Sequence, residues 1–223
     1  MMDFLSSSAF WIGLAKIIGI NIVLSGDNAV VIALAARTLP PSQQRRAILF
    51  GSGAAVALRV LLTAVAAWLL TLAWLQIAGG LLLLWIGVQL FSADHAEGAG
   101  KSQGSLFSAI RAILAADLVM SLDNVVAVAA AAQGSLTLLI LGLAISIPLV
   151  VFGSTLMMGL MGRYPFIIAA GAALIGWVAG ETFIKDAALA SFVGGRDWPH
   201  YAAAALGAAL VLAAGKIRAR RTS

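Results

Sequence analysis

The sequence contains no cysteine and only two histidines, His95 and His200, among its 223 residues. The absence of cysteine excludes disulfides, thiolate metal ligands and cysteine nucleophiles. His95 falls outside the long apolar runs and His200 stands at the very start of the last one, so we do not expect a zinc site built on buried imidazoles. Because the sequence also lacks a nucleophile–base pair, a P-loop and any nucleotide motif, we expect neither an enzyme, nor a resident cofactor, nor direct coupling to ATP.

Charged residues are scarce as well. They make up 10% of the chain, whereas hydrophobic residues make up 62%. A soluble domain carries about 25% charged residues, so this composition is typical of a membrane protein. The net charge of +5 does not indicate nucleic-acid binding, because most of it lies in short basic clusters beside the apolar runs.

Seven apolar runs are long enough to cross a lipid bilayer, which requires about 20 mostly apolar residues per helix. They cover roughly 10–36, 46–70, 74–91, 107–132, 135–160, 164–187 and 199–216. The connections that share a side with the C-terminus are rich in arginine and lysine, whereas the opposite side carries only Lys185 and Arg196. The positive-inside rule therefore predicts an N-terminus outside and a C-terminus in the cytoplasm.

An internal repeat relates the two halves of the chain. Residues 21–36 read NIVLSGDNAVVIALAA and residues 117–132 read DLVMSLDNVVAVAAAA, so a shift of 96 aligns S-x-D-N with its flanking alanines. A shift of 92 aligns the third and sixth runs, including Trp85 with Trp177, while Gly51 with Gly142 is the main match between the second and fifth. Because the unit has three helices, an odd number, the second copy is predicted to cross the membrane in the opposite direction.

The predicted fold is an all-α membrane protein with an inverted 3+3 helix repeat and one C-terminal helix. Inverted repeats of this kind are typical of secondary transporters, whose sites lie near the midplane at the repeat interface. The predicted segments are a first repeat at 1–91, a cytoplasmic polar linker at 92–106, a second repeat at 107–190, a seventh helix at 199–216 and a basic cytoplasmic tail at 217–223.

The repeated motif places acids inside apolar runs, where each costs roughly 2.5–3.5 kcal/mol on insertion scales. Asn21, Ser25 and Asn28 stand at i, i+4 and i+7, one face of a helix, and the second copy repeats that face with Asp117, Ser121 and Asn124. Asp27 and Asp123 sit one residue off this face, and Gly26 could allow a local unwinding.

The predicted convergence of carboxylates, carboxamides and hydroxyls provides oxygen donors without sulfur or imidazole. Such sites suit hard cations such as Mg²⁺, Ca²⁺ and Mn²⁺. The alternative is that these polar groups hydrogen-bond across helices and only hold the bundle together.

The two motifs resemble the paired motifs of the TerC family of integral membrane proteins, which belongs to a superfamily of LysE-type exporters. The resemblance runs from the first span through GWVAGETF in the sixth. It implies efflux of manganese from the bacterial cytoplasm across the inner membrane, with tellurite resistance as an older label. It also implies a cation site with Asp27, Asn28, Asp123 and Asn124 at its core, flanked by Asp117, Ser25 and Ser121.

Two further charged residues bear on this site. Glu181 aligns with the neutral Gln89, and we weigh an exit-side metal ligand or proton carrier equally against an interfacial carboxylate in water. Arg59 lies near the middle of the second run and has no counterpart, because Val150 stands at the corresponding position. We hypothesise that Arg59 neutralises Asp117 in at least one transport state. The rival hypothesis is that Arg59 faces a water-filled passage and Asp117 binds the metal directly.

The leading hypothesis is a secondary transporter in the lipid bilayer that exports a hard divalent cation, with Mn²⁺ as the first candidate and proton coupling left open. One alternative is transport of Ca²⁺ or another ion on the same scaffold. Another is a non-transporting membrane assembly or tellurium-resistance protein, which would need no strict charge at the D-N pairs. The sequence leaves the oligomeric state undetermined.

Overall fold

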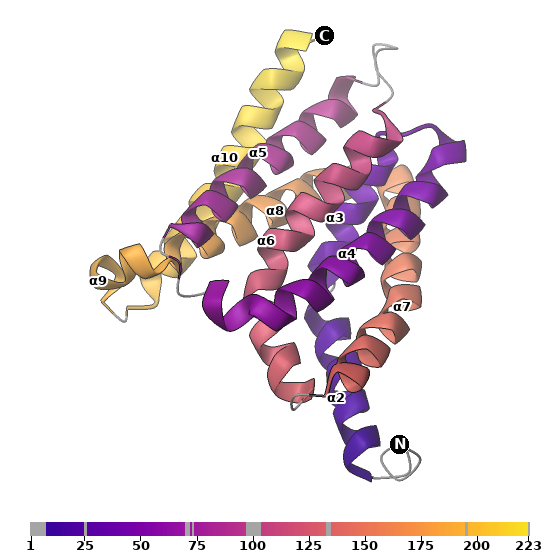
Figure 1. Cartoon of the computed structure of the whole chain (residues 1–223). Helices are drawn as coiled ribbons and strands as arrows, with labels where there is room; N and C mark the ends of the chain where they lie inside the picture. Colours follow the sequence, from indigo (N-terminus) through magenta and orange to yellow (C-terminus); the bar gives the residue numbers. More distant parts are fainter. Residues whose placement is uncertain are drawn as a thin grey trace.

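A computed structural model of the chain describes residues 8–24, 26–69, 72, 74–96, 104–132, 135–194 and 196–222. Figure 1 shows that these residues form helices joined by short connections. The helices are α2 (Ser8–Leu24), α3 (Gly26–Arg37), α4 (Pro41–Leu69), α5 (Leu75–Ala96), α6 (Leu106–Ala132), α7 (Leu136–Arg163), α8 (Phe166–Ile184), the 3₁₀ turn η2 (Ala187–Leu189), α9 (Ala190–Val193) and α10 (Trp198–Thr222). No strand occurs among the described residues, so the predicted all-α class is confirmed.

The described helices include five that are long and apolar enough to cross a membrane: α4, α5, α7, α8 and α10. Two bent segments, α2 with α3 and the two parts of α6, raise the number to seven if each counts as one span. These seven segments coincide with the seven predicted runs. The membrane directions of the two repeats stay a prediction.

Two helix ends differ from the predicted boundaries. Residues 92–96, which the sequence assigns to a polar linker, continue α5 as helix, and residues 217–222 of the predicted tail continue α10. Helices need not stop where the bilayer stops, because alanine, arginine and lysine are good helix formers in water as well.

The helices pack as two groups. In one group α5, α8 and α10 pack on one another, and in the other α4 packs along α6 while α7 packs along α2 and α3. Small residues allow the closest approach in the first group, since a Cβ at Gly176 or Gly180 of α8 would overlap the backbone of α10 at Gly207 or Ala203. Such small-residue contacts are a common means of helix association in membranes.

The second group contains a matched pair of contacts. Gly51 of α4 receives the side chain of Ile113 on α6, and Gly142 of α7 receives the side chain of Ile17 on α2. The two glycines are repeat partners in the sequence, and the two isoleucines are 96 positions apart, like the D-N motifs. The pairing of α4 with α6 and of α7 with α2 is therefore compatible with the predicted repeat.

Asp186 joins the two repeats at the end of α8. It is 1% exposed, and its carboxylate accepts hydrogen bonds from the backbone N–H groups of Trp74 (3.0 Å), Gln76 (3.0 Å), Ile77 (3.1 Å) and Ala188 (2.8 Å). Burial alone would raise the pKa of Asp186, but these N–H groups together hold the pKa below its usual value. Asp186 thus caps the N-terminus of α5, where Trp74 adopts a left-handed backbone with φ of 72°.

Candidate functional site

Both spans that carry the D-N motif change direction at the motif. The axes of Phe10–Asn21 and Gly26–Arg37 differ by 51°, and those of Leu106–Leu122 and Asn124–Ala132 differ by 68°. In the first span one described helix ends at Leu24 and the next begins at Gly26, and the unwinding predicted at that glycine stays a prediction. The sequence did not predict the bend at Asp123, which has no adjacent glycine or proline.

Arg59 of α4 lies between the two motif spans and makes three side-chain hydrogen bonds. Its Nη2 donates to Asp117 Oδ1 (2.5 Å), its Nε to Ser121 Oγ (3.0 Å) and its Nη1 to Asn21 Oδ1 (3.3 Å). The arginine is 5% exposed and the aspartate 6%. The hypothesis that Arg59 neutralises Asp117 is confirmed by this ion pair.

The three partners of the guanidinium belong to the two polar faces predicted from helical spacing. Asn21 belongs to the first motif span, and Asp117 and Ser121 belong to the second. Asn21 and Asp117 are repeat partners at a shift of 96. The two copies therefore converge on one cation, and in this structure that cation is a side chain of the protein.

A small cavity of about 20 Å³ lies beside the ion pair. It is lined by Asn28, Ile32, Ser52, Ala55, Val56, Arg59, Asp117 and Val150. Oδ2 of Asp117 and Oγ of Ser52 are buried and have no hydrogen-bond partner among the described residues. A space of this size holds one water molecule or one ion that has shed its water. The cavity thus offers oxygen donors to a single small guest.

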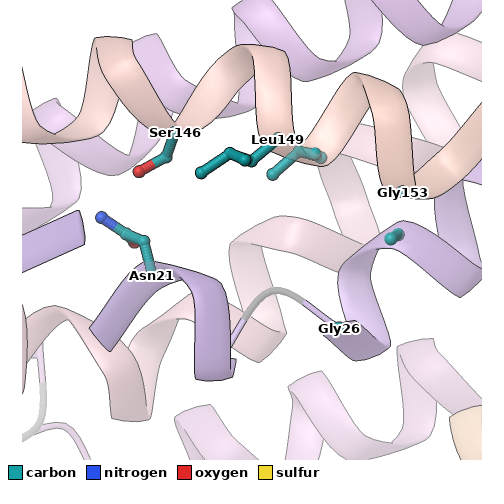
Figure 2. Close-up of a pocket in the computed structure, with 7 residues that line it drawn as sticks. Asn21, Gly26, Ser146, Leu149 and Gly153 are labelled. Atoms are coloured by element: carbon teal, nitrogen blue, oxygen red, sulfur yellow. The ribbon is translucent and has the colours of Figure 1, made fainter. Parts of the chain in front are cut away.

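A second, larger cavity of about 210 Å³ lies at the interruption of the first motif span. It is lined by Asn21, Gly26, Ala29, Ser146, Leu149, Val150 and Gly153. Figure 2 shows the amide of Asn21 on α2 and the hydroxyl of Ser146 on α7 pointing toward each other. Nδ2 of Asn21 is buried and has no partner among the described residues. This space is large enough for several water molecules.

The predicted core residues of the first motif lie close to the ion pair. Asp27 is half-buried in the first turn of α3, where its Oδ1 accepts a hydrogen bond from the backbone N–H of Asn28 (2.8 Å). It also interacts electrostatically with Arg59 and Asp117. Asn28 is 4% exposed and lines the small cavity. Asp27 and Asn28 therefore belong to the same neighbourhood as Asp117.

The predicted residues of the second motif are less fully described. The side chain of Asp123 and the whole of Ser25 lie outside the described residues, and Asn124 is half-buried on α6. Across the part of the chain that the structure describes, no three Asp, Glu or His side chains gather in a cluster of metal-ligating geometry. The predicted role of Asp123 and Asn124 stays a prediction.

Glu181 is not among the residues that line either cavity. It is half-buried on α8, where its Oε1 accepts a hydrogen bond from Trp177 Nε1 (3.1 Å) one turn earlier. Because α8 packs mainly on α5 and α10, Glu181 is not brought together with Asp27, Asn28 and Asp117 in this structure.

Sequence reasoning did not identify several residues that line the two cavities, among them the polar residues Ser52 and Ser146, and it did not assign Val150 to a wall shared by both. Ser52 lies on α4 and the other two lie on α7, the pair of helices whose repeat signal is faint. The alignment of Gly51 with Gly142 would place Ser146 opposite Ala55 and Val150 opposite Arg59. The offset between Gly51 and Gly142 was therefore the feature of the sequence that could have identified Ser146 and Val150.

The chain is similar to one family model over nearly its whole length and to several bacterial membrane proteins. The family model described as "Integral membrane protein TerC family" matches residues 6–223. The membrane protein YjbE of Bacillus subtilis (strain 168) is 44% identical over 184 residues, 82% of this chain and 84% of its own. The UPF0053 inner membrane protein YoaE of Escherichia coli (strain K12) is 32% identical over 145 residues, 56% of this chain and 28% of its own. No solved structure matches the chain.

Proposed function

Because this chain belongs to the TerC family of integral membrane proteins, we propose that it is a secondary transporter that exports a hard divalent cation, with Mn²⁺ as the first candidate. The observation that carries the proposal is the bend of both motif spans at the D-N pair. Discontinuous spans at a repeat interface are the usual location of ion sites in secondary transporters. Irregular backbone at membrane depth is tolerated where it lines a cavity, and a cavity borders the first break.

The donor chemistry supports a hard cation over a soft one. Asp117 and Ser52 line the small cavity, and their Oδ2 and Oγ atoms have no hydrogen-bond partner among the described residues. The sequence holds no cysteine. Carboxylate, hydroxyl and carboxamide oxygens suit Mn²⁺, Mg²⁺ and Ca²⁺. The choice of Mn²⁺ among these rests on the family resemblance, since oxygen donors alone do not separate them.

The membrane location and orientation are part of the proposal. YoaE is named an inner membrane protein, which supports the bacterial cytoplasmic membrane for this chain as well. The excess of arginine and lysine on the side of the C-terminus supports an N-terminus outside and a C-terminus in the cytoplasm. Export then means passage from the side that carries Arg45 and Arg46 to the side that carries Lys185.

The test is the metal content of cells that express the protein, measured under Mn²⁺, Ca²⁺ and Zn²⁺ challenge. Asp27→Asn and Asp123→Asn keep size and hydrogen bonding but remove a charge that a dehydrated cation needs. We expect wild-type cells to lower their manganese content, and both variants to lose this effect at normal protein level. Asp197→Asn, at an exposed position before α10, is the matched control.

The competing functions give different outcomes in the same experiment. Protection against Ca²⁺ alone would support another cation on the same scaffold. Full manganese tolerance in both Asn variants would support a membrane assembly that does not transport. Stronger protection against zinc than manganese would contradict the hard-cation assignment.

A further inference from the structure

The polar face predicted to bind the transported cation is occupied by a cation that belongs to the protein. The guanidinium of Arg59 contacts Asp117 and Ser121 from one repeat and Asn21 from the other. The guanidinium group of an arginine carries a positive charge in proteins. A metal ion that approaches Asp117 therefore meets a fixed positive charge.

The two charges would share one small space. Arg59 and Asp117 both line the cavity of about 20 Å³, and the free Oδ2 of Asp117 belongs to the same carboxylate that accepts from Nη2. Like charges a few ångströms apart repel strongly where the dielectric constant is low. A divalent ion at Asp117 and the guanidinium in its present position are thus nearly exclusive.

The neighbouring cavity gives the arginine somewhere to go. Val150 lines both cavities, and Asn21, which accepts from Nη1, lines the larger one of about 210 Å³. A movement of the guanidinium toward Asn21 would enter open space and not packed core. The side chain can remain hydrogen-bonded to Asn21 Oδ1 while it leaves Asp117.

We propose that Arg59 is a tethered counter-cation, which holds Asp117 when the site is empty and is displaced by the divalent ion when the site is loaded. The inference rests on the proposed function and adds the regulation of its site. An empty carrier with a bare buried carboxylate would be costly to reorient, and Arg59 removes that cost. Net export, which requires the empty carrier to return, therefore depends on Arg59, whereas exchange of one bound metal for another does not.

The first measurement is Mn²⁺ binding to the purified full-length protein by calorimetry. Arg59→Gln removes the competitor, so we expect Mn²⁺ to bind at least about tenfold more tightly than to wild type. Arg59→Lys keeps a charge but not the fork that contacts three partners, so its affinity should lie between the two. Arg46→Gln, at an exposed position on the same helix, should bind as wild type does.

The second measurement separates net efflux from exchange in vesicles loaded with radioactive Mn²⁺. With metal-free buffer outside, Arg59→Gln should lose efflux, whereas with unlabelled Mn²⁺ outside it should retain exchange. Arg59→Lys should retain both. If the glutamine variant does not accumulate, the lysine variant decides: tighter binding with retained efflux supports the proposal, and wild-type or weaker binding overturns it.

A purely structural role for Arg59 predicts a different pattern. Affinity in Arg59→Gln would equal or fall below the wild-type value, or exchange and net efflux would fall together, and either result overturns the inference. Absence of Mn²⁺ binding in wild type itself would overturn the proposed function first, and this outcome is distinct from the others.

Discussion

The cavity that Asp117 and Arg59 line measures about 20 Å³, whereas the cavity that Asn21 and Val150 line measures about 210 Å³. The two pairs of residues correspond in the sequence repeat, so an acid and an arginine in one pair stand where the other pair has uncharged side chains. An ion pair stands beside the small cavity, whereas the residues that line the larger one carry no charge. Corresponding positions of the sequence repeat therefore line a small cavity in one place and a large cavity in the other.

The largest expected effect comes from breaking the ion pair between Arg59 and Asp117 beside the small cavity. Arg59→Leu or Asp117→Leu alone leaves a buried charge unpaired, which costs about 3–5 kcal/mol, whereas removal of both often costs far less. We therefore expect each single variant to lose protein level and thermal stability, and the double variant to recover much of the loss. Thermal unfolding of the purified proteins measures this.

Val150, which corresponds to Arg59 in the repeat, provides the control. Val150→Leu changes an uncharged wall, so it should leave stability nearly unchanged. Additive losses in the Arg59 and Asp117 double variant would contradict the pair.

A second, smaller effect concerns the matched glycine contacts, which should be equally sensitive if they are repeat partners. Gly51→Ala and Gly142→Ala each push a methyl group into a packed isoleucine, Ile113 or Ile17, and overpacking of this kind costs about 1–3 kcal/mol. If the contacts are repeat partners, the two losses in unfolding free energy should be similar. Gly53→Ala, which meets no neighbouring atom, should be neutral or stabilising. A loss at only one of the two glycines would weaken the repeat.

A third test fills the larger cavity, which Asn21 and Val150 line. A Cβ at Gly153 meets Ala29 at 3.5 Å, an ordinary contact, so Gly153→Val should fold with its methyl groups in the cavity. We expect a several-fold reduction of Mn²⁺ efflux from cells at normal protein level. Gly159→Val on the same helix has open space around it and should transport normally. Equal transport by both variants would show that the cavity is not on the path.

The smallest effect concerns the Asp186 cap, which joins the halves at the start of α5. The pKa of Asp186 is lowered in the folded protein, so its contribution to stability is present above the unfolded pKa of about 3.9 and is lost as pH falls through the folded value. The wild-type protein should therefore lose thermal stability below about pH 4 more steeply than Asp186→Asn. Asp197→Asn, at an exposed position, should keep the wild-type slope.

The ion pair was predictable because Arg59 and Asp117 are opposite charges whose counterparts, Val150 and Asn21, are neutral, and both lie near mid-depth of their spans. Hydropathy located seven apolar runs, five of which are single helices and two of which are bent pairs, since a bilayer imposes helix length directly. Helical spacing placed Asn21 and Ser121 on the polar faces, but it did not predict their hydrogen bonds to Arg59. These predictions depend on local periodicity and on charge, which can be read directly from a sequence.

The cap at Asp186 and the two cavities were not predictable in the same way. Asp186 acts on Trp74, Gln76 and Ile77, more than a hundred residues earlier, and nothing in its local sequence names those partners. A cavity depends on the shapes of side chains from several helices. The alignment of Glu181 with Gln89 likewise did not indicate that α8 packs mainly on α5 and α10. The role of Glu181 stays a prediction.

In the proposed function, the charges at the two D-N pairs allow a divalent cation to cross the membrane. The most direct test is Mn²⁺ flux through vesicles that contain the purified protein, compared among wild type, Asp27→Asn and Asp123→Asn. We expect flux in wild type, and flux no higher than that of protein-free vesicles in both variants. Wild-type flux in both variants, at equal protein content, would show that these charges are not needed for transport.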